Sequence, residues 1–478
     1  MNPILSPSHQ IKYAWREVDR VEPPKRPVAD RLCDFHAIVI PYDEATAQAQ
    51  ASRCVQCPNP NCVAACPLGT PIAELLALTA DGQFKEAAAL LFATHTMPEI
   101  ASHICVGGRV CENVCVLSGK SDAVPIRSIT KFLLNYGWTH GLAEPPVAPE
   151  KGQRVAVIGS GICGLVCADA LSRMGYAVTV MDSRQKPGGR VMNGLPGFRV
   201  DKALVERRVE LLKQQGVQFR MSVVCGQDVK LSDLRREFDA VFLGFSRAEP
   251  LPLEVPGAEL RGVHQVFPFV AQSTANGQSA TARINVQGRR VVVLGGGDTA
   301  MDALRIAIRR GTREALCLYR RDRANMPADA EEIANAEEEG ARFQFLSQPV
   351  AIIGNPAGEV THVRCVRTEL DEPDETARRG VKPVAGTEFD VPADVVLVAY
   401  GFTAPKLPQT DEFASLAVSE RGYPLVDADQ MTNLPGVFAG GSVVRGAVPL
   451  VEVVRDARKA AATIDRYLAT QLSQGASL

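Results

Sequence analysis

The sequence contains no apolar run of the roughly 18 residues that a membrane-spanning helix needs. An excess of one charge is also missing: 52 Lys and Arg stand against 54 Asp and Glu, giving a formal net charge of -2 and no basic surface for nucleic acid. Residues 1–30 carry scattered charges and prolines where a secretory signal would have an apolar core. We therefore expect a cytoplasmic protein that neither enters a membrane nor binds nucleic acid.

The chain also lacks any arrangement of Ser, His and Asp that points to a nucleophilic triad. Its hydrophobic (46%) and charged (22%) fractions are ordinary for a globular protein. At 478 residues it is too long for one compact core, which predicts two or three domains. Any chemistry is expected to reside on bound cofactors.

Cysteine is the residue type that stands out, with thirteen in the chain. In a reducing compartment, cysteines are seldom paired as structural disulfides. Seven of them form two groups, the first with the spacing C-x2-C-x4-C-x3-C-P and the second in CVGGRVCENVC. The first group is Cys54, Cys57, Cys62 and Cys66, and the second is Cys105, Cys111 and Cys115.

The spacing of these cysteines favours iron over zinc. Zinc fits poorly because neither a second C-x2-C pair nor an H-x3-5-H pair is present. Iron–sulfur loops use a C-x2-C followed by two more cysteines, and the last one, before a proline, commonly ligates a second cluster. Two [4Fe-4S] clusters fit best, although seven cysteines leave one ligand short. Buried free thiols are the alternative.

The stretch between the cysteine groups is helical in pattern. Residues 70–92 predict two amphipathic helices with a break at Asp81-Gly82. We therefore expect residues 1–150 to form a small all-α domain that carries the clusters.

A proline-rich stretch, EPPVAPEKGQ, precedes the first dinucleotide-binding pattern. Residues 154–182 read as a strand, a glycine loop, a helix and a second strand that ends in Asp182. In the loop, Gly159 would make the tight turn, Gly161 would admit a pyrophosphate, and Gly164 would let the helix pack on the strand. Asp182 would accept the hydroxyls of an adenosine ribose.

The pattern recurs over residues 290–321. Its loop has Gly295, Gly297 and Ala300 at the three key positions, with Asp298 and Thr299 between them. The second strand ends in Arg320-Arg321 instead of an acid, and guanidinium groups match the oxygens of a 2′-phosphate. This predicts a preference for NADPH, with a solvated pair of arginines as the alternative.

The C-terminal part predicts a return to the first fold. Residues 393–402 contain a buried strand, and Gly440-Gly441-Ser442 lies between a short strand and a long terminal helix whose N-terminus could stabilise a reduced flavin. The interpretation is an FAD-binding domain, 151–280 plus 395–478, interrupted by an NADPH-binding domain, 285–394. The glutamate-rich run at 330–340 is expected to be a solvated helix face.

Together these residues resemble the small (β) subunit family of NADPH-dependent glutamate synthase and the N-terminal half of dihydropyrimidine dehydrogenase. The most specific motifs are the cysteine groups, GLPGFRVDKALVERRVELL, VVLGGGDTAMDALRIAIRRG and LYRRDRANMP. The resemblance implies electron flow from NADPH to FAD and through two [4Fe-4S] clusters to a partner. It also implies that Cys54, Cys57, Cys62 and Cys115 hold one cluster, and Cys66, Cys105 and Cys111 the other.

The chain departs from the family at several positions. Thr130 aligns with the family's eighth cluster ligand, a Glu or Gln, and Ser442 replaces an acid that contacts the flavin. Gly189-Arg190 replaces a Gly-Leu beside the expected flavin, and Phe245 lies in another altered loop. The main hypothesis is an electron-input flavoprotein within a hetero-oligomer that has a larger redox subunit. The alternative is a non-catalytic assembly or relay subunit with a degenerate flavin site.

Overall fold

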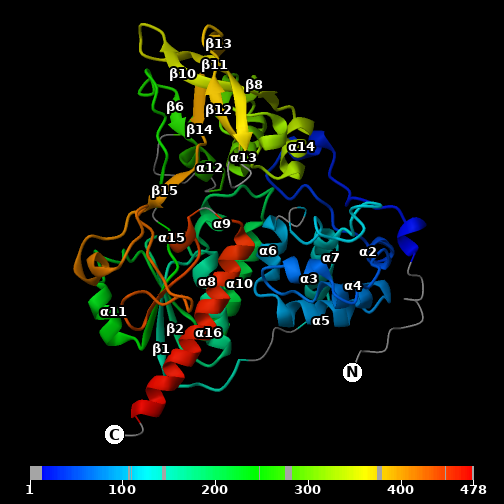
Figure 1. Ribbon diagram of the computed structural model, residues 1–478, viewed down its shortest axis with the longest axis vertical. Helices are drawn as coiled ribbons and strands as arrows, with labels where there is room; N and C mark the ends of the chain where they lie inside the picture. Colours follow the sequence, from blue (N-terminus) through cyan, green and yellow to red (C-terminus); the bar gives the residue numbers. More distant parts are fainter. Residues whose placement is uncertain are drawn as a thin grey trace.

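A helical N-terminal part lies beside two parts built on parallel sheets (Figure 1). This computed structural model describes residues 13–105, 108, 110–142, 147–246, 248–274, 283–373, 379–446 and 448–475. Within those ranges, no helix combines the length and the apolar character that a membrane crossing requires. The α/β class with an N-terminal helical domain, expected from the sequence, is confirmed.

Short helices build the N-terminal part. The predicted helix pair is present as α4 and α5, and Gly82 between them takes a positive φ of 71°. Leu76, Leu91 and Leu133 are buried in the core that these helices share with α7. The helices are α1 (Val28–Leu32), α2 (Glu44–Ser52), α3 (Asn61–Ala65), α4 (Ile72–Ala80), α5 (Phe84–Thr94), α6 (Pro98–Ile104) and α7 (Ile126–Thr139).

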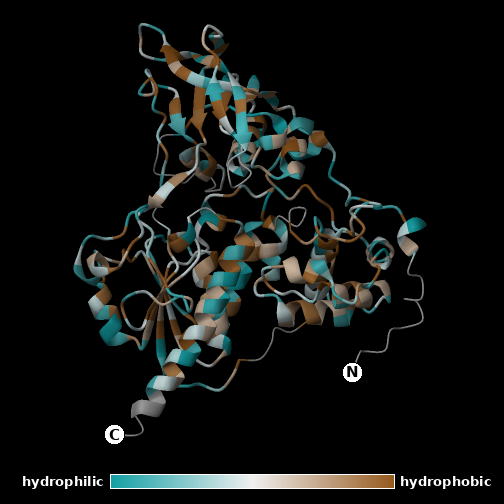
Figure 2. Cartoon of the chain, in the orientation of Figure 1, coloured by the Kyte–Doolittle hydropathy of each residue, from teal (hydrophilic) through white to brown (hydrophobic). Residues whose placement is uncertain are grey.

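The first parallel sheet has the strand order β16-β4-β1-β2-β3. Its strands are β1 (Arg154–Ile158), β2 (Ala177–Asp182), β3 (Gln218–Met221), β4 (Ala240–Leu243) and β16 (Val437–Ala439). The helices of this part are α8 (Ile162–Arg173), α9 (Gly189–Asn193), α10 (Lys202–Gln214), α11 (Leu231–Glu237), α15 (Ser442–Arg445) and α16 (Leu450–Gly475). In Figure 2, α16 alternates between hydrophilic and hydrophobic residues, as a helix with one buried face does.

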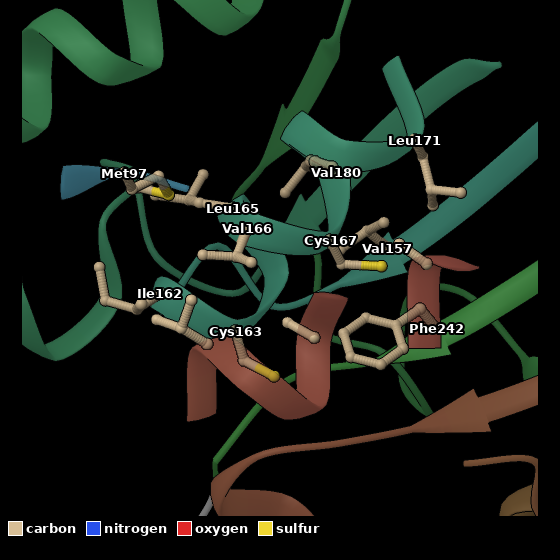
Figure 3. Packing of buried hydrophobic residues seen from close by; sticks show 14 of the residues in the cluster. Met97, Val157, Ile162, Cys163, Leu165, Val166, Cys167, Leu171, Val180 and Phe242 are labelled. Atoms are coloured by element: carbon tan, nitrogen blue, oxygen red, sulfur yellow. The ribbon is translucent and has the colours of Figure 1, made fainter. Parts of the chain in front are cut away.

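The helical part is packed into the core of the first sheet domain. Met97, at the start of α6, lies against Leu165 of α8 (Figure 3). Ile100 belongs to the same buried cluster, and Cys66 and Cys105 pack against it. The predicted cluster-bearing part and the predicted flavin part therefore share a continuous apolar interface.

The second parallel sheet has the order β6-β14-β7-β8-β9. Its strands are β6 (Val263–Gln265), β7 (Arg290–Leu294), β8 (Glu314–Leu318), β9 (Arg342–Gln344) and β14 (Val395–Val398), and its helices are α12 (Val266–Thr274), α13 (Asp298–Arg309) and α14 (Ala330–Glu338). An antiparallel sheet that the sequence did not predict follows β9, made of β10 (Ser347–Gly354), β11 (Val360–Pro373), β12 (Arg379–Pro383) and β13 (Phe389–Pro392).

The strand pairing corrects the expected boundaries of the inserted domain, 285 and 394. Strand β14 pairs with β7 and β6, so it completes the second sheet and does not return to the first. The chain crosses between the two domains at β5 (Ala248–Pro250) and β15 (Phe402–Pro405), which pair with each other. The strand that returns to the first sheet is β16, which pairs in parallel with β4.

The glutamate-rich run is solvated only in part, which corrects a second expectation: Glu337 and Glu338 are exposed, but the glutamate after them is not. Glu339, directly after α14, is buried and accepts hydrogen bonds from Arg305 and Arg309 of α13. Burial alone would raise the pKa of Glu339, but the hydrogen bonds from Arg309 and Arg305 outweigh it and hold the pKa below its ordinary value. Arg31 of α1 lies 3.8 Å from the same carboxylate, so the run ties the N-terminal segment to the inserted domain.

We expect Glu339→Ala to destabilise the protein by about 3–5 kcal/mol, because it leaves the buried guanidinium of Arg309 without its counter-charge and leaves Arg305 with Glu332 alone. The matched control is Glu338→Ala at the neighbouring position, where the carboxylate is 40% exposed and contacts Lys25 and Arg31. That change should cost no more than about 1 kcal/mol. Urea unfolding of the two variants checks the difference, and equal midpoints would contradict it.

Candidate functional site

A cavity lies at the carboxyl ends of β1, β2 and β4. Strand β1 has β2 on one side and β4 on the other, and such a reversal of strand order is where open α/β sheets bind ligands. Six predicted residues line the cavity: Gly159, Gly161, Asp182, Gly189, Arg190 and Ser442. The other three, Gly164, Gly440 and Gly441, are not part of its lining.

The backbone of the first glycine loop fits a dinucleotide. Gly159 has a φ of 104°, which favours glycine, and a Cβ on Gly164 would lie 1.8 Å from the Gly159 carbonyl oxygen. A Cβ on Gly161 would meet no protein atom within 4 Å. Gly161 therefore leaves open space at the N-terminus of α8, where a pyrophosphate can approach.

Asp182 is held rigidly at the end of β2. One carboxylate oxygen accepts hydrogen bonds from the Ser160 amide (2.7 Å) and hydroxyl (2.8 Å), and the other accepts from the Arg184 amide (2.9 Å). The half-buried carboxylate faces the cavity. This position suits an acceptor of ribose hydroxyl protons.

The segment around Ser442 differs in detail from the expectation. Ser442 begins the four-residue helix α15, and the long helix α16 begins only at Leu450, which also lines the cavity. A buried acid, Asp456 of α16, contacts this segment, but its carboxylate accepts from the Gly441 amide (3.3 Å) and the Arg445 Nε (2.6 Å) and does not line the cavity. Asp456 therefore does not replace the missing acid within the cavity.

The second glycine loop has the same form as the first. Gly295 has a φ of 134°, and its Cβ would lie 2.5 Å from the Ala399 carbonyl oxygen. At Gly297 the nearest atom to a Cβ would be 4.0 Å away, which leaves room above the N-terminus of α13. Ala300 is buried in the third position, Thr299 is half-buried, and Asp298 accepts a hydrogen bond from the Asp329 amide (2.8 Å).

The two arginines after β8 face different surroundings. Arg320 is exposed. Arg321 is buried, and its guanidinium donates to the Arg379 carbonyl (2.5 Å) and to the Tyr319 hydroxyl (3.4 Å). Because those bonds hold Arg321 in the protein interior, Arg320 is the arginine of the pair that is free to contact a phosphate.

Four of the predicted cluster ligands line one small cavity: Cys54, Cys57, Cys62 and Cys115. Burial, together with the neighbouring cysteines, raises the pKa of the Cys54 thiol to about 12. Within the described residues, no three His, Cys, Asp or Glu side chains converge on a point that a single metal ion could occupy. The cysteines instead surround a space, which is how thiolates hold an iron–sulfur cluster.

Of the other three, Cys66 and Cys105 lie at the interface with the first sheet domain, and Cys111 is buried in the helical core. Cys66 packs against both the helical core and the sheet-domain core, and Cys105 against the latter. Burial raises the pKa of Cys105 to about 11. The hydroxyl of Thr130 donates to the Ile126 carbonyl of its own helix at 2.9 Å, so it is already engaged within α7.

Two features of the site lie outside every sequence motif. Phe267 of α12 and Phe402 of β15 bring aromatic rings to Arg190, with ring centroids 5.1 Å and 4.0 Å from its guanidinium carbon. Ile104 lines the cavity of the first sheet and is followed directly by Cys105. Neither could be found from local spacing, because each depends on contacts between domains.

Comparisons with known proteins agree with this architecture. Three family models match: dihydropyrimidine dehydrogenase domain II, 4Fe-4S cluster (residues 31–142), NAD(P)-binding Rossmann-like domain (157–204) and pyridine nucleotide-disulphide oxidoreductase (222–461). FprA from Mycobacterium tuberculosis, solved in complex with NADPH, has a TM-score of 0.56 and 19% identity over 69% of this chain and 86% of its own. At that identity the similarity shows the fold.

Curated relatives match along nearly the whole chain. The glutamate synthase [NADPH] small chain of Escherichia coli is 37% identical over 96% of this chain and 99% of its own length. The corresponding chain of Azospirillum brasilense is 39% identical, covering 93% and 94%. The putative oxidoreductase AegA of Escherichia coli is 38% identical over 98% of this chain and 72% of its own.

The protein is therefore an NADPH-dependent oxidoreductase with sites for FAD and iron–sulfur, in which electrons pass between these cofactors. Two glycine loops, each at the start of a helix, and a cysteine-lined helical domain are the parts that such a protein needs. The chain belongs to the family of the glutamate synthase [NADPH] small chains.

Proposed function

We propose that this chain takes electrons from NADPH and passes them through FAD and two [4Fe-4S] clusters to a larger redox subunit in a hetero-oligomer. The partner is either a glutamate synthase large subunit, as the names of the relatives suggest, or another oxidoreductase. The observation that carries the proposal is the direct step from Ile104, in the flavin cavity, to Cys105.

The packing of the cysteines supports an order for the two clusters. Cys105 and Cys66 lie against the core of the flavin domain, and Cys66 also reaches the core of the helical domain. The cavity lined by Cys54 and Cys115 belongs to the helical domain. Electrons that leave the flavin would therefore meet the three-cysteine group first and the four-cysteine group second.

Exposed apolar side chains suggest where the partner docks. Val114 and Val116, on either side of Cys115, line the four-cysteine cavity and are 37% and 46% exposed. Apolar residues beside the last cluster fit a surface that a partner covers. This part of the chain is the proposed exit for electrons.

The residues have distinct tasks in this scheme. When bound, the cofactors supply the chemistry: FAD accepts a hydride from NADPH, and the clusters carry single electrons. The Gly161 and Gly297 loops provide helix N-termini for the two pyrophosphates. Asp182 accepts hydrogen bonds from the hydroxyls of the adenosine ribose of FAD. Arg320 pairs with the 2′-phosphate of NADPH.

An anaerobic titration with NADPH, and then with NADH, tests the proposal through the visible spectra of flavin and clusters. We expect prompt bleaching by NADPH and a much weaker effect of NADH. In Arg320→Ala the preference should fall roughly tenfold, since one charge-assisted contact is lost. Purified protein that neither carries FAD nor binds it when supplied would contradict the proposal and favour a relay subunit with a degenerate flavin site.

A further inference from the structure

Arg190 places a positive charge in the flavin cavity. It lies on α9, one residue after Gly189, and both residues line the cavity together with Gly161. A Cβ on Gly189 would lie 2.6 Å from the Gly161 Cα, so α9 approaches the pyrophosphate loop closely. The side chain of Arg190 is half-buried, which leaves its guanidinium partly open to the cavity.

Aromatic rings hold this guanidinium, and no acid among the described residues pairs with it. Its carbon lies 4.0 Å from the Phe402 ring centroid and 5.1 Å from that of Phe267, and the two rings meet edge to face. Burial lowers the pKa of Arg190, and the like charge of Arg184 lowers it further. A cation without a counter-charge in a cavity is arranged to meet negative charge that arrives from outside the protein.

Bound FAD would bring such a charge. A hydride from NADPH, which would leave as NADP+, would deliver two electrons and one proton to the flavin and so add one negative charge to its ring system. Charge near the reactive ring is one of the means by which a protein tunes a flavin.

We propose that the guanidinium of Arg190 stabilises the negative charge of the reduced flavin and so raises the reduction potential of the flavin. This inference rests on the proposed function, since it requires FAD in the cavity. Phe267 of the inserted domain and Phe402 of the returning strand β15 hold the Arg190 guanidinium in place. The flavin's potential would therefore depend on contacts between domains.

The test compares Arg190→Leu, Arg190→Gln and Arg190→Lys with the unchanged protein, all loaded with FAD. The first readout is the affinity of the oxidised flavin for sulfite. Sulfite adds to the flavin through an N–S bond at N5 and leaves a negative charge on the ring. The second is the midpoint potential of the flavin. For Leu and Gln we expect sulfite to bind about tenfold more weakly, as the loss of one charged contact predicts, and the potential to fall by about 30 mV for that tenfold change.

The lysine variant separates charge from packing, because it keeps the cation and loses the planar group. Sulfite binding by Arg190→Lys should stay within about threefold of the unchanged protein, on the premise that charge sets the effect. The inference would be overturned if Arg190→Leu and Arg190→Gln both kept the sulfite affinity and the potential of the unchanged protein. It would also be overturned if Arg190→Lys lost as much sulfite affinity as they do. FAD content, measured first, separates this from failure of the proposed function, in which the unchanged protein binds no flavin.

Discussion

Cys105→Ala is expected to remove the flavin-side cluster while NADPH still bleaches the flavin. Cys105 packs against the core of the first sheet domain and follows Ile104, which lines the cavity of that domain, so the proposed scheme puts it between the flavin and the remaining cysteines. Iron should fall from about eight toward about four atoms per chain as one cubane is lost. The rate at which NADPH reduces the remaining cluster should also fall. Loss of a residue that only contacts a metal ligand costs roughly 10–100-fold, and we expect a larger effect here because a ligand itself is lost.

Iron and sulfide analysis, together with electron paramagnetic resonance after NADPH addition, measures both effects. The matched control is Cys33→Ala, because Cys33 is exposed and belongs to neither cysteine group. It should leave the iron content and the rate unchanged. Full iron and normal cluster reduction in Cys105→Ala would show that the proposed order of the cofactors is wrong.

Gly164→Ala and Gly161→Ala are expected to fail in different ways. A Cβ on Gly164 would lie 1.8 Å from the Gly159 carbonyl oxygen, and backbone cannot give way as a side chain can. The α8 helix would have to move off β1, at a cost of about 3 kcal/mol or more. We expect this variant to lose both its FAD and much of its thermal stability.

Gly161→Ala should fold normally and bind FAD poorly. Its φ of -69° is allowed for alanine, and the new methyl group meets no protein atom within 4 Å. The methyl group would occupy space that the pyrophosphate needs, so we expect the Kd for FAD to rise roughly hundredfold, or about 2.8 kcal/mol. Thermal melts without added FAD check the folding, and flavin fluorescence titration checks the binding. Wild-type affinity in Gly161→Ala would place the pyrophosphate elsewhere.

The sequence was sufficient for features that depend on local geometry. Gly159 and Gly295 must take positive φ angles, so each loop shows its requirement in its own residues. The sheet to which β14 belongs could not be predicted in this way. The strands at 395–398 and 437–439 are both short, apolar and fully buried, and only the order of strands in space assigns one to each sheet.

The direction in which a side chain points was the second feature that could not be predicted from the sequence. Arg320 and Arg321 are adjacent in the bend that follows β8, and nothing in their local sequence shows which of the two turns inward. The partner that takes Arg321 inward is the carbonyl of Arg379, 58 residues away. In the same way, the burial of Glu339 depends on Arg305 and Arg309, which lie on another helix.

The paired crossings β5 and β15 bring the two ends of the inserted domain together. The Leu251 amide donates to the Gly401 carbonyl at 3.0 Å, so the two points where the chain leaves and re-enters the first domain are neighbours. Neighbouring strands are about 4.8 Å apart, which a two-residue hairpin turn can bridge. The covalent connection between the two domains is therefore a narrow two-stranded ribbon, so the length of the inserted chain does not set the register of the first sheet. Side chains such as Phe198, which lies in the core of the second sheet, are what fix the insert against the first domain.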